Sequence, residues 1–392
     1  MQLTPAKSDA YHYDLPLLYG ALMIMAMGLL MVASSSMGIA EQNLGSPFHY
    51  FFKQSLYMAL SVGIAFTVTR VPIQFWYAQQ GWLMLMSFFL LVLVVVPGIG
   101  HSVNGSMRWI RLGPISVQVS EITKCFVIVY LSGFLVRHRL AFEESALGWI
   151  RPLLLMVLTG CLLLLEPDFG ATVVILTTTF SLFFLAGLRL RYVLLLLGML
   201  LAAFTFLIIL APYRLERLTA FLHPWENQFG SGYQLTQSLI AFGRGGLWGA
   251  GLGNGLQKLF YLPEAHTDFL FAVMGEELGL LGCLAIMSAY ALLLCRGMVL
   301  GRKAYQKGAF FHAYLAYGFG LCLGTQALFN LAVNLGWLPT KGLTLPLMSY
   351  GGSSLIVNCM VVGVLLRVGH EVESEVISVK PIKKSRTTHW GQ

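Results

Sequence analysis

The sequence predicts an all-α, polytopic membrane protein with about ten transmembrane helices. Three observations lead to this fold class. Only 11% of the 392 residues are charged, against roughly 25% in soluble domains. The hydrophobic fraction is 57% and the mean hydropathy is +0.73. Apolar stretches of about 20 residues, the length that crosses a bilayer, recur along the whole chain. These features describe one membrane domain rather than two or three soluble ones.

Ten apolar stretches are expected to form the helices. In chain order they lie near 15–35, 52–69, 81–97, 120–136, 150–166, 169–187, 191–211, 268–295, 309–335 and 342–366. Two connections are long, near 98–119 and 212–267, and long loops in a compact domain usually carry function. The second, between helices 7 and 8, is rich in glycine and partly amphipathic, so short helices and turns along the membrane interface are expected there.

The lysines and arginines predict the orientation. With the N-terminus in the cytoplasm, 16 of the 25 fall on the cytoplasmic side, as the positive-inside rule requires. Both termini are then cytoplasmic, with residues 1–14 and 368–392 as tails around a membrane domain of 15–367. The net charge of +8 therefore reflects topology, and it does not indicate nucleic-acid binding.

The remaining lysines and arginines are unusual for the outer side of a membrane protein. They are Lys53, Arg108, Arg111, Lys124, Arg214, Arg217, Arg244, Lys258 and Lys341. Fixed cations in outer loops suit an anionic ligand, in particular a phosphate or pyrophosphate group. No nucleotide is available on that side, so a membrane-embedded headgroup is the expected ligand.

Asp268 is the leading candidate for a catalytic residue. It ends the polar loop of residues 262–267, which also contains Glu264 and His266, and we expect the eighth helix to start at Asp268 itself. A carboxylate at such a membrane boundary can serve as a general base, because partial desolvation raises its pKa. The residues expected on its face of the helix are small: Ala272, Gly275, Gly279 and Gly282.

Other charged residues gather on the same side of the membrane. Glu276 and Glu277 lie about two turns deeper than Asp268, where they are expected to pair with arginine or lysine. Glu121 and Lys124 are spaced as a helical ion pair or as two members of a site. The remaining acids and bases have equally ordinary roles as turn residues or snorkelling side chains. Taken together, they predict a pocket for a charged headgroup.

Several motifs support a resemblance that covers nearly the whole chain. They are Arg-Trp-Ile at 108–110, Gln-x-Ser-Glu-x-x-Lys at 118–124, Glu-Pro-Asp-Phe-Gly at 166–170, Pro-Glu-x-His-Thr-Asp-Phe at 263–269, Gly-Glu-Glu-Leu-Gly at 275–279 and Ser-Tyr-Gly-Gly-Ser-Ser at 349–354. This set resembles the SEDS family, the proteins of shape, elongation, division and sporulation. One departure is Val119, where the family usually has proline.

The resemblance implies a peptidoglycan glycosyltransferase. Such enzymes polymerise lipid II, a disaccharide-pentapeptide on undecaprenyl pyrophosphate, at the outer face of the bacterial plasma (inner) membrane. The essential aspartate of the family matches Asp268. The run Pro-Thr-Lys-Gly around Lys341 is more similar to the division branch, which implies enrichment at the septum. The implied partners are a class B penicillin-binding transpeptidase (FtsI-like) and other divisome membrane proteins (FtsQ/FtsL/FtsB-like).

The chemistry assigns further roles. Asp268 would take the proton of the attacking sugar hydroxyl, and fixed cations would hold the leaving pyrophosphate. The candidate substrate-binding residues are Arg108, Glu121, Lys124, Asp168, Arg214, Arg217, Glu264, His266, Lys341 and Ser349. The residues predict no resident metal or cofactor, although a divalent cation, Mg²⁺ or Mn²⁺, would be an alternative to the protein's own cations.

Two other function classes fit a membrane protein of this kind. One is a flippase for lipid II, in which Glu276, Glu277 and Lys124 would line a polar path. The other is a non-catalytic divisome scaffold whose charges only bind partner helices. A flippase needs a path that reaches both faces, whereas the recognisable polar clusters gather outside, so the glycosyltransferase remains the leading hypothesis.

Overall fold

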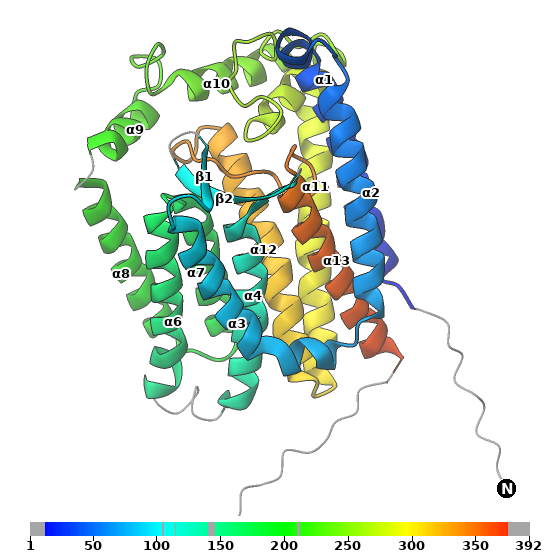
Figure 1. Ribbon diagram of the computed structural model, residues 1–392, viewed down its shortest axis with the longest axis vertical. Coiled ribbons are helices and arrows are strands. Elements are labelled where there is room, and N and C mark those ends of the chain that lie inside the picture. The colour runs from blue at the N-terminus through cyan, green and yellow to red at the C-terminus, as the bar shows by residue number, and fades with distance from the viewer. Residues whose placement is uncertain (1–11, 104–105, 114, 140–145, 210–211, 375–392) are drawn as a thin grey trace, which may run out of the picture.

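The computed structural model describes residues 12–103, 106–113, 115–139, 146–209 and 212–374. Within them, eight helices are long and apolar enough to cross a membrane, and α7 and α8 are shorter apolar helices. The predicted polytopic helical fold is confirmed (Figure 1). The bundle helices are α1 (Leu15–Leu44), α2 (His49–Arg70), α3 (Ile73–Val95), α4 (Val119–Arg137), α6 (Ala146–Leu165), α7 (Phe169–Leu185), α8 (Leu190–Ile209), α11 (Leu270–Gln306), α12 (Phe310–Asn334) and α13 (Gly352–Glu373).

The loop at 98–119 is not helical or irregular but forms a small antiparallel sheet. Its strands are β1 (Gly100–Val103), β2 (Ser106–Leu112) and β3 (Ile115–Gln118), in the order β1-β2-β3. Gly113, with φ +64°, lies just after β2 and takes the left-handed conformation that glycine tolerates. β3 leads directly into α4, so the sheet connects Arg108 of β2 to the first turn of α4. A purely all-α prediction therefore misses this element.

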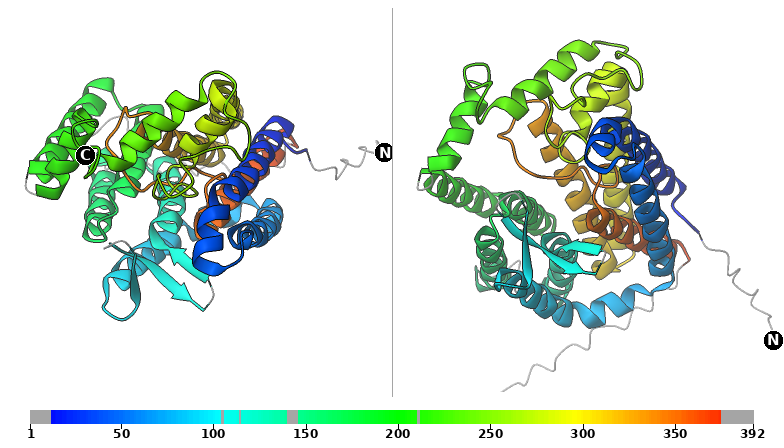
Figure 2. Two further views of the ribbon diagram at one scale, coloured as in Figure 1. Left: turned by 90° about the horizontal axis from the view of Figure 1, so that it is seen from above. Right: turned by 45° about the horizontal axis from the view of Figure 1, so that its top comes forward.

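The second long loop contains two short helices, as predicted. They are α9 (Pro212–Leu222) and α10 (Tyr233–Gly245). α10 packs against α11 and α12. Figure 2 shows α10 and the three-stranded sheet at the same end of the bundle. The described ends of the chain lie at the opposite end, where the His12 amide donates to His370 Nδ1 at 3.2 Å.

The eighth membrane helix differs from the prediction in two ways. α11 begins at Leu270, so Asp268 lies in the loop before it, and Gly279 breaks the helix with φ 64° and ψ −163°. The glycine-rich segment after α10 fills the break: the Ala250 amide donates to the Glu276 carbonyl, and the Leu280 amide donates to the Gly246 carbonyl, both at 2.9 Å. The expected stripe of small residues on one helical face is therefore wrong.

The last membrane helix begins at Gly352, ten residues later than expected. Pro346 cannot donate a helical hydrogen bond, and Leu347 has a positive φ of 64°, so this segment is irregular. Its carbonyls are bound by side chains instead: Tyr290 donates to the Pro346 carbonyl, and Gln54 donates to that of Ser349 at 3.3 Å. Irregular backbone at membrane depth requires such partners.

Glu276 and Glu277 form the expected ion pairs. Arg244 of α10 lies 2.8 Å from Glu276, and Lys258 lies 2.6 Å from Glu277. Both carboxylates are essentially inaccessible to solvent, and each also accepts backbone amides of the glycine-rich loop. Two of the unusual outer cations therefore fasten this loop to α11 instead of binding a ligand.

Candidate active site

A cavity of about 1020 Å³ opens at the end of the bundle that is remote from the described chain ends. It lies among β2, the first turn of α4, the turn before α7, α10 and the two loops that precede α11 and α13. Its lining is mixed, with charged groups among apolar and aromatic ones. The ionisable residues that line it, tyrosine aside, are Arg108, Glu121, Asp168, Glu264, Asp268 and Lys341.

Asp268 is held in place through its backbone. Its carbonyl accepts hydrogen bonds from the side-chain amides of Asn330 at 2.9 Å and Asn334 at 3.0 Å. Its carboxylate lies against Gly342, where an added Cβ would stand 3.2 Å from Oδ2. Protein surrounds the side chain on most sides, yet part of its surface stays open to the cavity.

This enclosure changes the acidity of Asp268. Burial, the larger cause, and the charge of Glu264 together raise its pKa from 3.8 to about 7. Arg108 acts in the opposite direction and Asp168 in the same direction as Glu264. A carboxyl with a pKa near 7 is ionised in about half of the molecules at neutral pH, which suits a group that must accept a proton and later release it.

The loop before Asp268 is shaped by Glu264. Glu264 has a φ of 56°, and its carbonyl accepts the backbone amides of Thr267 and Phe269, each at 3.2 Å. The Thr267 hydroxyl donates to Glu264 Oε2 at 2.6 Å. These bonds fold the loop so that Glu264, Thr267 and Asp268 all line the cavity.

His266 points to a different environment. Its ring lies 4.9 Å from that of Tyr50 and 5.4 Å from that of Tyr350, measured between centroids. Burial lowers its pKa, which favours the neutral imidazole. Tyr350 lines the cavity but His266 does not. The structure therefore places His266 behind the cavity wall, in an aromatic cluster.

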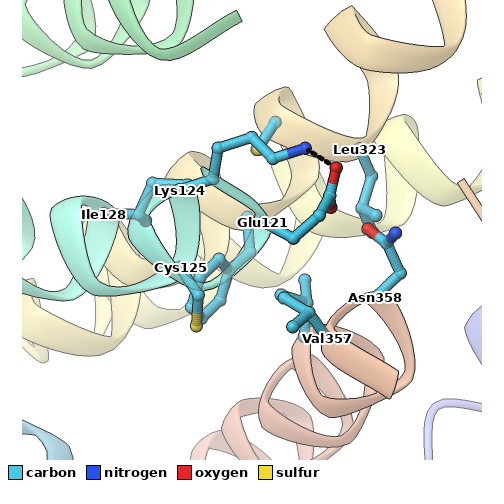
Figure 3. Close-up of a pocket in the computed structure, with 10 residues that line it drawn as sticks. Glu121, Lys124, Cys125, Ile128, Leu323, Val357 and Asn358 are labelled. Atoms are coloured by element: carbon cyan, nitrogen blue, oxygen red, sulfur yellow. Dashed lines mark hydrogen bonds and ion pairs between the residues drawn. The ribbon is translucent and has the colours of Figure 1, made fainter. Parts of the chain in front are cut away.

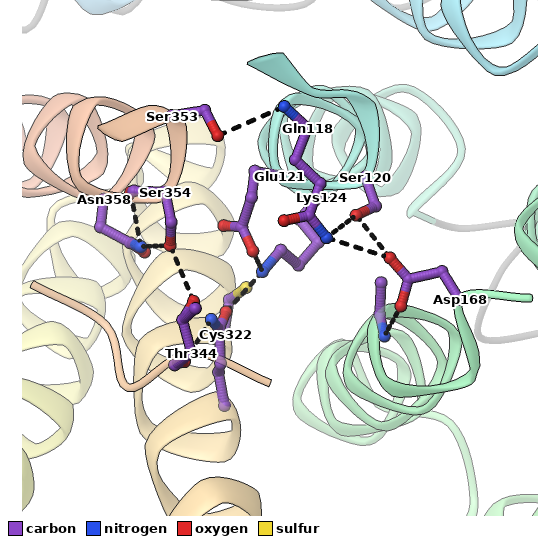
Figure 4. Close-up of polar contacts among 12 residues, drawn as sticks. Gln118, Ser120, Glu121, Lys124, Asp168, Cys322, Thr344, Ser353, Ser354 and Asn358 are labelled. Carbon is purple, nitrogen blue, oxygen red and sulfur yellow. Dashed lines mark hydrogen bonds and ion pairs between the residues drawn. The ribbon is translucent and has the colours of Figure 1, made fainter. Parts of the chain in front are cut away.

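Arg108 and Asp168 form one wall of the cavity. Arg108 donates through Nε to the Glu166 carbonyl at 3.2 Å and through Nη2 to the Pro167 carbonyl, and its Nη1 lies 3.9 Å from Asp168. Asp168 also caps α7 by accepting the Ala171 amide at 3.1 Å. Figure 4 shows Ser120 and Gln118 reaching it from the start of α4, at 2.7 and 3.3 Å.

Glu121 and Lys124 pair inside the bundle. Lys124 Nζ lies 2.8 Å from Glu121 Oε1 and also donates to Gln326 of α12. Both residues are at most 4% exposed, so the pair is shielded from solvent. Glu121 lines the large cavity, while Lys124 lines only a space of about 10 Å³ behind it (Figure 3). α4 starts at Val119 in spite of the missing proline.

The other residues predicted to bind the substrate lie in different places. Lys341 lines the cavity, with Nζ 4.5 Å from the centre of the Phe169 ring. Ser349 is buried outside the cavity, where its hydroxyl accepts the Leu345 amide at 3.0 Å. The side chains of Arg214 and Arg217, in α9, lie outside the described residues. Six of the eleven candidate residues thus meet in one cavity.

The described residues offer no ready metal site. Among them no group of three or more histidine, cysteine, aspartate or glutamate side chains is arranged to hold a metal ion. The Asp168 carboxylate comes from a different loop than those of Glu264 and Asp268, and Asp168 and Glu264 already accept hydrogen bonds from protein donors. Among the residues that the structure describes, these carboxylates therefore do not form a site for a resident divalent cation.

Comparison with known proteins gives the family. The model of the cell cycle proteins FtsW, RodA and SpoVE matches residues 15–374. The chain belongs to this family. A relative from Coxiella burnetii, named "Probable peptidoglycan glycosyltransferase FtsW", is 53% identical over 93% of this chain and 98% of its own. One with the same name from Legionella pneumophila is 50% identical over 96% of each chain. The resemblance to the SEDS family, and to its division branch, is confirmed.

Solved structures agree with this membership. A chain from "Structural coordination of polymerization and crosslinking by a peptidoglycan synthase complex" matches with a TM-score of 0.74 and 29% identity, covering 92% of this chain and 98% of that one. The crystal structure of the Thermus thermophilus rod shape determining protein RodA matches with a TM-score of 0.67 and 28% identity, covering 92% and 97%. The fold described above is therefore the fold of this family.

Sequence reasoning missed a row of amides on α12. Gln326, Asn330 and Asn334 are spaced by four residues, so they share one face of the helix. Gln326 donates to the Thr344 carbonyl at 3.0 Å, and Asn330 donates to that of Leu343. This amide row connects the Glu121–Lys124 pair to the backbone of Asp268. Its signal in the sequence was three amide side chains at helical spacing in a largely apolar stretch.

Proposed function

We propose that this chain is a peptidoglycan glycosyltransferase that polymerises lipid II into glycan strands. The observation that carries the proposal is the position of Asp268, a carboxylate with a pKa near 7 in a large cavity that also contains Arg108 and Lys341. Membership in a family whose relatives bear the name peptidoglycan glycosyltransferase supports it. An anionic, lipid-linked sugar suits a cavity of this charge at a membrane boundary.

In the proposed reaction Asp268 is the general base. The 4-hydroxyl of the acceptor sugar attacks C1 of the donor, and Asp268 takes the hydroxyl proton as the new C–O bond forms. The bond from C1 to the lipid pyrophosphate breaks, and its electron pair leaves with the pyrophosphate. Arg108 and Lys341 would stabilise the charge that develops there. A single displacement inverts C1, from an α-linked pyrophosphate to a β-linked glycan.

The same proposal includes orientation and partners. Both chain ends would lie in the cytoplasm, with residues 1–14 and 368–392 as tails, because most lysines and arginines fall on that side. The cavity would then face outward on the plasma membrane, at the division septum. A class B penicillin-binding transpeptidase would be the crosslinking partner, because the fold matches a chain of a peptidoglycan synthase complex that coordinates polymerization and crosslinking. FtsQ/FtsL/FtsB-like proteins would complete the septal assembly.

The test is polymerisation of lipid II by the purified full-length chain with its transpeptidase partner. We expect polymer from the wild type and a loss of at least about 100-fold for Asp268→Asn, which keeps the shape of the side chain but cannot accept the proton. Glu226→Gln is the matched control, because Glu226 is an exposed acid outside the cavity. It should polymerise at the wild-type rate.

The other function classes predict different results. Equal activity in Asp268→Asn and wild type would remove Asp268 from the role of base. Absence of polymer from every version, together with passage of lipid II across vesicle membranes, would favour a flippase. Absence of both activities, with partner binding intact, would favour a scaffold.

A further inference from the structure

The loop between α10 and the Asp268 segment exposes several large apolar and aromatic side chains. We call residues 246–262 the apolar loop. Lys258 is its one charged residue, and it is buried, with Nζ 2.6 Å from Glu277 and 2.8 Å from the Ser34 hydroxyl. The exposed large side chains of the loop are Leu247, Trp248, Leu252, Leu256, Leu259, Phe260 and Tyr261. The loop thus turns its charge inward and its apolar side chains outward.

Two polar contacts between α1 and α11 indicate where this loop lies relative to the bilayer. Near the described chain ends, Arg296 pairs with Asp14 at the start of α1. Further along the same helices, Ser34 donates to Glu277 at 2.7 Å. Ser34 follows Asp14 by about 20 helical residues, or roughly 30 Å, which equals the thickness of the hydrocarbon core. Glu277 and the Lys258 that it holds therefore lie at the membrane boundary remote from the chain ends.

The apolar loop continues the surface of α11 that faces lipid. The Leu281 amide donates to the Leu247 carbonyl at 3.4 Å, so Leu247 and Trp248 lie level with the helix just past its break. Around this point α11 exposes Leu280, Leu281 and Leu284, each about half accessible. Trp248 itself is 79% exposed. Tryptophan favours this boundary, since its ring is apolar and its N–H can reach the headgroups.

We propose that the apolar loop docks into the bilayer leaflet remote from the chain ends, with Trp248 at the boundary between headgroups and acyl chains. The occupant of this surface is lipid, because the surface joins the lipid-facing side of α11 and its one charged side chain is already paired. Pro263 follows the loop directly, so docking sets the depth of Asp268 relative to the headgroups. The proposal does not depend on the glycosyltransferase activity.

The test measures the depth of Trp248 in the full-length chain in lipid nanodiscs. Subtracting the emission of Trp248→Phe from that of the wild type isolates the fluorescence of Trp248. We expect phosphatidylcholine brominated near the headgroup, at carbons 6 and 7, to quench it about twofold more than lipid brominated at carbons 11 and 12. Trp82→Phe is the matched control, because Trp82 is 72% exposed near the middle of α3. Trp82 should show the reverse order.

Two results would overturn the proposal. In the first, neither brominated lipid quenches Trp248 while iodide in the buffer does, which would place the loop in water. In the second, adding the membrane-anchored transpeptidase partner abolishes the quenching by lipid, which would assign the surface to a protein. The phenylalanine variants are conservative, and equal elution of both from a sizing column confirms that they fold.

Discussion

At the scale of single residues, the reactivity of Asp268 arises from a balance of neighbours. Burial and the Glu264 charge favour the protonated carboxyl, whereas Arg108 favours the carboxylate. Arg108 donates to two backbone carbonyls and faces Asp168. Its guanidinium is therefore held in position, and Asp168 neutralises its charge only partly. The carboxyl thus titrates near neutral pH instead of near 4.

The activity should therefore depend on pH around the pKa of Asp268. A base acts only when ionised, so kcat/KM for lipid II polymerisation should rise through pH 7, level off above it, and fall about tenfold per unit well below it. In Glu264→Gln a charge that raises the pKa is removed. The rising limb of that variant should move to lower pH, as measured by initial rates in a series of buffers.

Stability provides an independent check on the same pKa. The pKa in the fold, about 7, exceeds the ordinary 3.8, so ionisation of Asp268 costs stability increasingly as pH rises from about 4 through 7. Asp268→Asn does not ionise. The Tm of Asp268→Asn minus the Tm of the wild type should therefore increase as the pH rises from 5 to 8. A difference in Tm that is constant with pH, or a flat rate profile, would contradict the raised pKa.

The sequence predicted correctly that several charged residues lie near the site. It did not predict which of the candidate side chains face the cavity. Asp268, Arg108 and Lys341 meet in one cavity as expected. His266 and Ser349 turn away from it, because the loops that hold them are irregular and the positive φ of Glu264 resets the direction of the following residues. Helical or strand periodicity gives no information about such directions.

At the scale of elements, the position of Asp268 depends on α12 more than on α11. Asn330 donates to the carbonyls of both Asp268 and Leu343. It thus connects the loop before α11 to the loop before α13, and both loops line the cavity. Asn334 holds the Asp268 carbonyl and accepts the Ala272 amide at 3.2 Å. α12 therefore serves as the rigid support for a base that lies on irregular backbone.

Removing one amide of this row should lower turnover. Asn330→Ala deletes both hydrogen bonds, which lets the Asp268 and Leu343 segments move apart. Because a misplacement of about 1 Å can cost roughly 100-fold in rate, we expect kcat to fall by about 10- to 100-fold while KM changes little. Steady-state polymerisation kinetics of the purified complex measure both constants.

The control for this variant is Asn254→Ala. Asn254 is an exposed amide that donates to a loop carbonyl, that of Ala250, at 3.2 Å, so its kcat should equal that of the wild type. If Asn330→Ala instead raised KM with kcat unchanged, Asn330 would act in substrate binding and not in positioning Asp268.

Hydropathy located the eight described helices that are long and apolar enough to cross a membrane, and the two shorter apolar ones, but not the irregular segments between them. It gave no signal for the sheet at 98–119, since three short strands in a loop leave no apolar period of helical length. It placed the start of the third helix near residue 81, although α3 begins at Ile73, directly after Pro72. Gln74, Gln79 and Gln80 lower the hydropathy of this segment and so concealed that start. The break at Gly279 depends on packing against a distant loop, which no local pattern contains.

At the scale of the whole molecule, buried acids fasten each end of the bundle. Toward the cavity, Glu276 and Glu277 hold the glycine-rich loop to α11. At the opposite end, Glu371 of α13 lies 2.8 Å from the His312 ring and 2.7 Å from Arg367, and it accepts the Ile73 amide at 3.0 Å. Glu371 therefore joins α13 to the starts of α12 and α3.

Loss of Glu371 should destabilise the bundle strongly. Glu371 is 7% exposed and accepts from three donors in three segments. Glu371→Ala therefore removes the acceptor of the Ile73 amide and the carboxylate partner of the part-buried Arg367, which keeps only the Thr69 carbonyl. Breaking a buried pair on one side costs about 3 kcal/mol or more. Glu373→Ala is the matched control, since its partner Lys303 and Glu373 itself are both more than 40% exposed, and such exposed pairs contribute at most about 1 kcal/mol.

Thermal unfolding of the two full-length variants in the same detergent distinguishes these contributions. We expect a clear drop in Tm for Glu371→Ala and almost none for Glu373→Ala. Arg367→Ala should cost less in the Glu371→Ala background than in the wild type, because the arginine has already lost its carboxylate partner and keeps only the Thr69 carbonyl. Equal drops for both single variants would mean that the end of the bundle is held by apolar packing alone, with Glu371 as a replaceable surface acid.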